Sequence, residues 1–133
     1  MKNKLRSIKI DISEYLYTVT NKYHSGPKTN MLTIKIYLSG QKKTPLILDF
    51  LTLDDFHIGQ PLNSGVILTN TKTNTTTTVN INEPKYIREF ILKGLKNGWT
   101  GSNNLGVQNG LEYLTDLGFE VSNLKPKANE QNQ

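Results

Sequence analysis

The chain has 133 residues, which is enough for one domain that buries about two-thirds of its surface on folding. It contains no cysteine, which excludes a disulfide framework and a cysteine-based metal site. Its net charge of +5 is uneven, because residues 1–43 carry nine lysines and arginines against Asp11 and Glu14. This basic third is suited to an acidic partner, to nucleic acid or to a membrane surface, or it simply keeps the protein's surface solvated.

No targeting signal or membrane span is predicted. The basic residues at the start are followed by isoleucines that alternate with polar residues, not by an apolar stretch. No apolar run comes near the roughly 18 residues of a membrane helix. We therefore expect a cytoplasmic protein without a membrane partner.

The first half of the chain predicts strands. Apolar residues alternate with polar ones over 8–12 and then change parity over 15–19, which predicts a bulge or tight bend at 13–14. Residues 21–30 are polar and predict a connection that turns at Ser25-Gly26-Pro27. Alternation over 32–39 predicts a half-buried strand, and the denser apolar run 45–51 predicts a central strand, covered on both faces, that pairs antiparallel with it.

The middle of the chain is a loop followed by a hairpin. Residues 52–64 contain glycine, proline and two acidic residues and interrupt the strand pattern. Val66 to Leu68 restart a strand, and seven of the ten residues over 69–78 are threonine. These β-branched runs predict a hairpin that turns at 72–74 and returns through Val79 to Ile81.

Residues 82–121 predict two helices. Asn82 or Glu83 caps the first, Pro84 suits its first turn, and its buried positions are Ile87, Phe90, Ile91 and Leu95. Gly94 on the same stripe predicts close approach to the sheet, and Asn97-Gly98 predicts a left-handed cap that ends the helix. Asn109 caps the second helix, whose buried positions are Leu111, Leu114 and Leu117, and Gly118 ends it.

This order of elements predicts an α+β fold. We expect an antiparallel sheet of about six strands, with the two C-terminal helices packed on one face and a short terminal strand at Phe119 and Val121. Residues 1–122 are expected to form a single domain. Residues 123–133 are polar and are expected to be a disordered tail.

No catalytic, cofactor-binding or metal-binding set stands out, so we expect a protein that is not an enzyme. Asp54, Asp55 and His57 form the one cluster of titratable groups, which is the basis for an alternative, a small metal-dependent enzyme. The pattern Asp-Asp-x-His matches no established ligand spacing. Helix capping and surface charge account for it more simply.

Six residues are candidate contacts for a partner. Trp99, with Asn103 and Asn104 in the polar loop after it, either contacts a partner or closes the core. Tyr17 and Tyr37 lie in predicted strands together with Lys35. Tyrosines and lysines on a sheet suit a protein interface, and they also suit stacking on single-stranded nucleic acid. Arg6 and Arg88 are the sole arginines, which weakens the nucleic-acid alternative.

Residues 84–121 resemble small, mostly uncharacterised bacterial α+β proteins in three short motifs. These are Asn97-Gly98-Trp99 at a helix end, Asn109-Gly110 at a helix start, and Leu117-Gly118-Phe119 before a closing strand. Some proteins of this kind are immunity partners of polymorphic toxins, so the resemblance implies stoichiometric binding of a toxin domain and carries over no site residues. Our first interpretation is therefore a protein-binding protein, with a nucleic-acid-binding module as its alternative.

Overall fold

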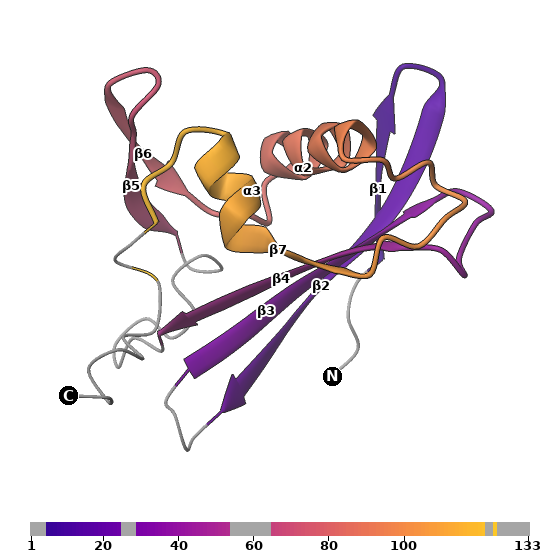
Figure 1. The fold of residues 1–133 in the computed structure, drawn as a ribbon, viewed down its shortest axis with the longest axis horizontal. Coiled ribbons are helices and arrows are strands. Elements are labelled where there is room, and N and C mark those ends of the chain that lie inside the picture. The colour runs from indigo at the N-terminus through magenta and orange to yellow at the C-terminus, as the bar shows by residue number, and fades with distance from the viewer. Residues whose placement is uncertain (1–4, 25–28, 54–64, 122–123, 125–133) are drawn as a thin grey trace.

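The structure is a computed structural model that describes residues 5–24, 29–53, 65–121 and 124. Its elements in chain order are β1 (Arg6–Ile10), β2 (Ser13–His24), β3 (Thr29–Leu38), β4 (Leu46–Leu53), β5 (Val66–Asn70), β6 (Thr75–Val79), α2 (Pro84–Lys96), β7 (Val107–Asn109) and α3 (Gly110–Asp116). The predicted α+β class, with a mostly antiparallel sheet and two helices, is confirmed (Figure 1).

The main sheet has five strands in the order β1-β2-β3-β4-β7. The first three pairs are antiparallel, and β7 is parallel to β4. The predicted bend is real but lies at Asp11 and Ile12, where Asp11 adopts a φ of 56°. Strands β2 and β3 extend well into the region that we expected to be a connection, and the expected turn at 25–27 lies outside the described residues.

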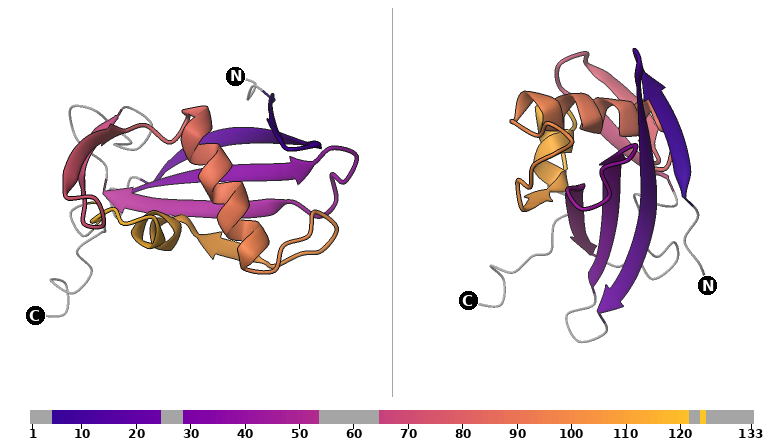
Figure 2. Two further views of the ribbon diagram at one scale, coloured as in Figure 1. Left: turned by 90° about the horizontal axis from the view of Figure 1, so that it is seen from above. Right: turned by 90° about the vertical axis from the view of Figure 1, so that its right-hand side faces the viewer.

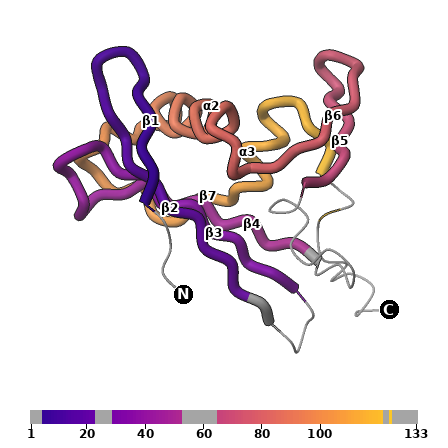
Figure 3. Tube along the Cα trace, turned by 180° about the vertical axis from the view of Figure 1, so that it is seen from behind, coloured from indigo at the N-terminus to yellow at the C-terminus, as the bar shows by residue number. Residues whose placement is uncertain are grey.

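The expectation of about six strands in one sheet is wrong. Strands β5 and β6 form the predicted hairpin, but they make a separate two-stranded sheet. The hairpin and the β1–β2 turn lie on opposite sides of α2 (Figure 3). Strand β7 was not expected, because its three residues show no periodicity and it becomes a strand only by pairing with β4.

Helix α2 crosses the sheet, whereas α3 lies beside β4 and β7 at the sheet's edge (Figure 2). A Cβ added at Gly94 would collide with Leu46 Cδ2, so this glycine allows the close approach that the sequence predicts. The Phe90 and Phe50 rings are 5.6 Å apart beneath it. Leu95 is exposed, contrary to expectation, because Gly94 rather than Leu95 faces the sheet.

The helix boundaries follow the expected signals. Pro84 occupies the first turn of α2, although the side chain of its N-cap residue Glu83 makes no capping hydrogen bond. The Asn109 side chain accepts a hydrogen bond from Leu111 N at 3.0 Å and caps α3. The two helices are joined by an ion pair of 3.2 Å between Lys93 Nζ and Asp116 Oδ2.

The core lies between the sheet, the helices and the inner face of the β5–β6 hairpin. It also includes Leu124, so the packed chain reaches beyond the expected domain end at residue 122. The rest of the expected tail lies outside the described residues. Among the helices that the structure describes, none has the length and apolarity needed to cross a membrane.

Candidate functional site

One face of the main sheet is buried under α2, and no described element covers the opposite face (Figure 2). The register places on this second face the side chains of Leu16, Thr18, Thr20, Lys22, Met31, Thr33, Lys35, Tyr37, Ile47, Asp49, Leu51 and Val107. We call this set the open face. Because side chains alternate along a strand, these are the neighbours of the buried residues of β2, β3 and β4.

The open face carries apolar side chains that remain accessible. Leu51 is 38% exposed and Val107 is 60% exposed, while Leu16, Met31 and Ile47 are half-buried. The expectation that β4 is covered on both faces is therefore wrong. The physical reason is that α2 and α3 pack on its even-numbered residues alone, as Gly94 does on Leu46 and Gly110 on Phe50.

Lys35 provides an exposed positive charge in the middle of the open face. In the register it lies between Thr18 on β2 and Ile47 on β4, and Ile47 in turn lies beside Val107. The nearest carboxylate in the next row is Asp49, whose Oδ1 accepts a hydrogen bond of 2.7 Å from Thr33 Oγ1. Lys35 thus offers its charge within a mainly apolar and threonine-lined surface.

The structure separates the six candidate contacts. Lys35 and Tyr37 lie on the open face, where Tyr37 is half-buried beside Leu16. Tyr17 points to the other side of the sheet beside Ile36 and is 2% exposed. Trp99 is 1% exposed, and its Nε1 donates to Thr44 O at 3.1 Å, so its indole is a lid on the core.

The two asparagines lie in the loop after α2. Asn103 stabilises this loop, because its Nδ2 donates to Gly98 O at 3.0 Å and its Oδ1 accepts from Thr100 N at 2.7 Å. Asn104 is exposed. Of the six residues, Lys35, Tyr37 and Asn104 therefore have side chains available to a partner.

Sequence reasoning missed Met31, Ile47, Leu51 and Val107 as candidate surface residues. Alternation over β3 does indicate two faces, but it does not say which face is covered. Val107 carries no signal of its own, because β7 is defined only by its partner strand.

Asp54, Asp55 and His57 lie outside the described residues, so the structure has no bearing on the metal-dependent alternative. Within the part of the chain that is described, no group of three or more histidine, aspartate or glutamate side chains could hold a metal ion.

Comparisons with protein-family models, with curated proteins and with solved structures found no significant match. The resemblance of residues 84–121 to small bacterial α+β proteins therefore stays an expectation.

Proposed function

We propose that this chain is a non-enzymatic protein-binding protein that acts as a bacterial immunity protein, neutralising a toxin domain by stoichiometric binding through the open face. The observation that carries the proposal is the exposed apolar surface around Lys35, on a sheet whose other face packs against the core. Contiguous apolar surface on a folded domain is a mark of an interaction site.

The residue types of the open face suit a protein partner. Tyr37 and Met31 belong to the types enriched in interfaces, and Leu51 and Val107 add apolar area beside them. The open face carries Lys22 and Lys35 against one acidic residue, Asp49. An acidic partner surface would be attracted and oriented by this charge.

Co-expression with the proteins encoded beside this chain's own gene tests the proposal. We expect a one-to-one complex in size-exclusion chromatography with light scattering. The double variant Lys35→Glu, Tyr37→Ala should weaken the complex by roughly 30-fold or more, the loss typical of a central contact. Arg88→Glu, on the exposed side of α2, is the matched control and should keep the affinity. A complex that survives the double variant, or no complex with any neighbour, contradicts the proposal.

A nucleic-acid-binding module is the second candidate, and one observation favours it. Six basic side chains of β1, β2, β3 and the turn after β3 are exposed, namely Arg6, Lys9, Lys22, Lys35, Lys42 and Lys43. Binding to single-stranded nucleic acid should fall steeply with salt, and each removed cation should lower the slope of log affinity against log salt by about 0.7. Absence of retention on nucleic acid at low salt excludes this candidate.

A further inference from the structure

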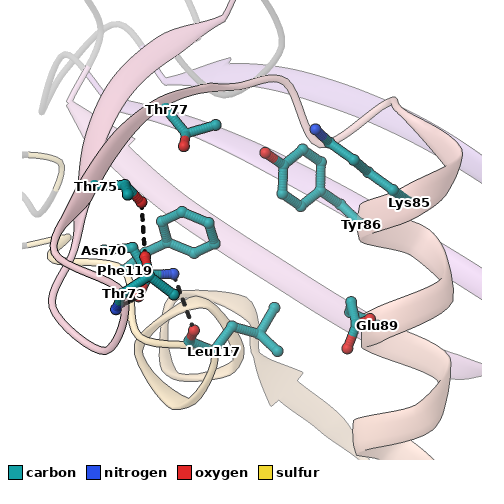
Figure 4. A pocket seen from close by; sticks show the side chains of 9 residues that line it. All are labelled: Asn70, Thr73, Thr75, Thr77, Lys85, Tyr86, Glu89, Leu117 and Phe119. Carbon is teal, nitrogen blue, oxygen red and sulfur yellow. Dashed lines mark hydrogen bonds between the residues drawn. The ribbon is translucent and has the colours of Figure 1, made fainter.

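The β5–β6 hairpin, α2 and the end of α3 surround a cleft of about 400 Å³ (Figure 4). Its volume is in the range of sites for small molecules. Leu117 and Phe119 form an apolar wall, threonines of the hairpin form a second wall, and the first turns of α2 form the third. The described residues that line the cleft are all different from those of the open face, so the two surfaces are separate.

The walls of this cleft are held together by hydrogen bonds. Thr71 N donates to Gly118 O at 2.8 Å, and Glu120 N donates to Thr69 O at 2.9 Å. The hairpin is therefore fixed to the end of α3, and the cleft is a preformed feature of the fold.

Several polar groups of the cleft are already paired. Thr73 Oγ1 and Thr75 Oγ1 share a hydrogen bond of 2.6 Å. Asn70 Oδ1 accepts from Lys72 N and from Thr73 N, and Asn70 Nδ2 donates to Leu117 O at 3.2 Å. These groups shape the hairpin turn and have little capacity left for a ligand.

Tyr86 is different. It is 5% exposed, yet its hydroxyl has no hydrogen-bond partner among the described residues. Figure 4 shows this hydroxyl pointing across the cleft toward the hairpin, where Thr77 lies. A buried hydroxyl without a partner is unfavourable and rare in folded proteins, so its presence on a cleft wall indicates that another molecule completes it.

Lys85 adds a positive charge near this hydroxyl. Its Nζ lies 5.1 Å from the centroid of the Tyr86 ring, and Figure 4 shows the amine and the hydroxyl on the side of the ring that faces away from Glu89. Within the described part of the chain, Lys85 takes part in no ion pair. Because an ammonium group on a flexible four-carbon stem can adjust its position, it can join the hydroxyl in binding one anion.

Glu89 determines which way round a ligand lies. It follows Lys85 by one helical turn and lines the cleft on the other side of the Tyr86 ring (Figure 4). Its carboxylate repels an anionic group. A ligand therefore places its negative charge beside Lys85 and an uncharged part toward Leu117 and Phe119.

We propose that this cleft binds a small monocarboxylate that has an apolar body. Its carboxylate accepts hydrogen bonds from Lys85 Nζ and from the Tyr86 hydroxyl, and its apolar body packs on Leu117 and Phe119. Lys85 is the one cation among the described lining residues, so it balances a single negative charge. A phosphate group carries nearly two and would leave one of them unbalanced in a cleft that also contains Glu89.

Titration of the isotope-labelled full chain with phenylacetate, followed through backbone amide chemical shifts, tests the site. We expect saturable shifts in the hairpin, in the first turns of α2 and at residues 117–119, and no such shifts on the open face. Phenylacetamide lacks the negative charge and acetate lacks the apolar body, so each should bind about tenfold more weakly or worse.

Variants of the protein identify the groups that bind. Tyr86→Phe removes only the hydroxyl and should weaken phenylacetate binding about three- to tenfold, while Lys85→Gln should weaken it about tenfold or more. Glu89→Gln removes a repelling charge and should bind phenylacetate at least as tightly as the unchanged chain. Tyr37→Phe and Lys96→Gln, which change the same residue types outside the cleft, should leave the affinity unchanged. The melting temperature of each variant shows that it is folded.

A hydroxyl satisfied by water alone predicts no saturable shifts with phenylacetate in the folded chain, and that result overturns the proposal. Binding that is equally tight for phenylacetamide, or that Tyr86→Phe and Lys85→Gln leave unchanged, also overturns it, because the carboxylate is then not recognised by these groups. Weaker binding by Glu89→Gln would reverse the orientation of the ligand and contradict the proposal as well. The site is independent of the proposed function, since none of these variants changes the open face apart from the control Tyr37→Phe.

Discussion

The ends of the two helices share one backbone design. At α2, Gly98 has a φ of 111° and Trp99 N donates to Gly94 O at 2.9 Å. At α3, Gly118 has a φ of 106° and Phe119 N donates to Leu114 O at 3.0 Å. Both are Schellman motifs, in which a left-handed glycine lets the next amide bond back to the last turn.

The two aromatic residues nevertheless pack in different places. Trp99 turns under the main sheet, where its ring lies 5.9 Å from the Tyr15 ring and its Nε1 bonds to the β3–β4 turn. Phe119 turns toward the hairpin, where it bridges to Asn70 and lies 6.2 Å from the Tyr86 ring. The local motif thus sets the turn of the chain, and the surrounding elements decide what the aromatic ring stabilises.

Trp99→Ala should give the largest loss of stability. It empties a fully buried site and removes the hydrogen bond to Thr44 O, so we expect the free energy of unfolding to fall by about 3–5 kcal/mol. Because Trp99 is the one tryptophan of the chain, the variant has no tryptophan fluorescence to follow. Its free energy of unfolding is therefore measured by urea unfolding followed by far-ultraviolet circular dichroism. A loss below about 1 kcal/mol would mean that Trp99 is not the lid of the core.

Phe119→Ala should cost about 3 kcal/mol, and its effect should be local. Phe119 connects α3 to the hairpin, whereas the pairs β2–β3 and β3–β4 do not involve it. Hydrogen exchange should therefore become faster in β5 and β6 while β2 and β3 keep their protection. Uniform acceleration across both sheets would show that the hairpin and the main sheet unfold as one unit.

The two glycines distinguish backbone strain from crowding. Gly98→Ala should cost about 1 kcal/mol, because only the left-handed conformation opposes it and the nearest atom, Leu105 Cδ2, would be 3.9 Å from the new Cβ. Gly118→Ala should cost about 2 kcal/mol or more, because the Cβ would also lie 2.5 Å from Asn70 Oδ1. Asn70 is held by two backbone amides and cannot easily move. Equal losses in thermal unfolding would contradict this contrast.

The smallest expected effect concerns Tyr113, which packs between the two helices. Burial raises the pKa of its hydroxyl above the usual 10.0 and the charge of Asp116 raises it further, while the hydrogen bond from Asn97 Nδ2 opposes this rise. The folded state therefore holds this proton more tightly, and its contribution to stability is complete below about pH 10 and is lost as the pH rises through the folded pKa.

Between pH 9 and pH 11, the free energy of unfolding should therefore fall less in Tyr113→Phe than in the unchanged chain. The expected difference is on the order of a few tenths of a kcal/mol, measured by urea unfolding at each pH. Tyr37→Phe, which removes a phenol from the open face, is the matched control. Identical alkaline profiles for Tyr113→Phe and the unchanged chain would contradict the raised pKa.

Much of the local structure could be predicted from the residues. Pro84, Gly98, Asn109 and Gly118 mark the helix boundaries as expected, because capping and left-handed dihedral angles depend on a few neighbouring residues. The threonine-rich hairpin was also expected, since β-branched runs on either side of a polar turn favour it.

The candidate site could be predicted only in part. Tyr17 and Tyr37 look alike in the sequence, yet Tyr17 pairs with Ile36 on the buried face and Tyr37 pairs with Leu16 on the open face. Strand alternation separates two sets of side chains but does not say which set a helix covers.

The sequence by itself determined the position of most strands and of both helices, because these follow from periodicity and from backbone preferences within a few residues. Only the tertiary structure decided that the hairpin leaves the main sheet, that β7 joins β4 in parallel, and that Tyr86 faces a cleft. Each of these features depends on contacts between segments far apart in the chain. Which of these contacts form is decided by the packing of the whole core rather than by any local pattern.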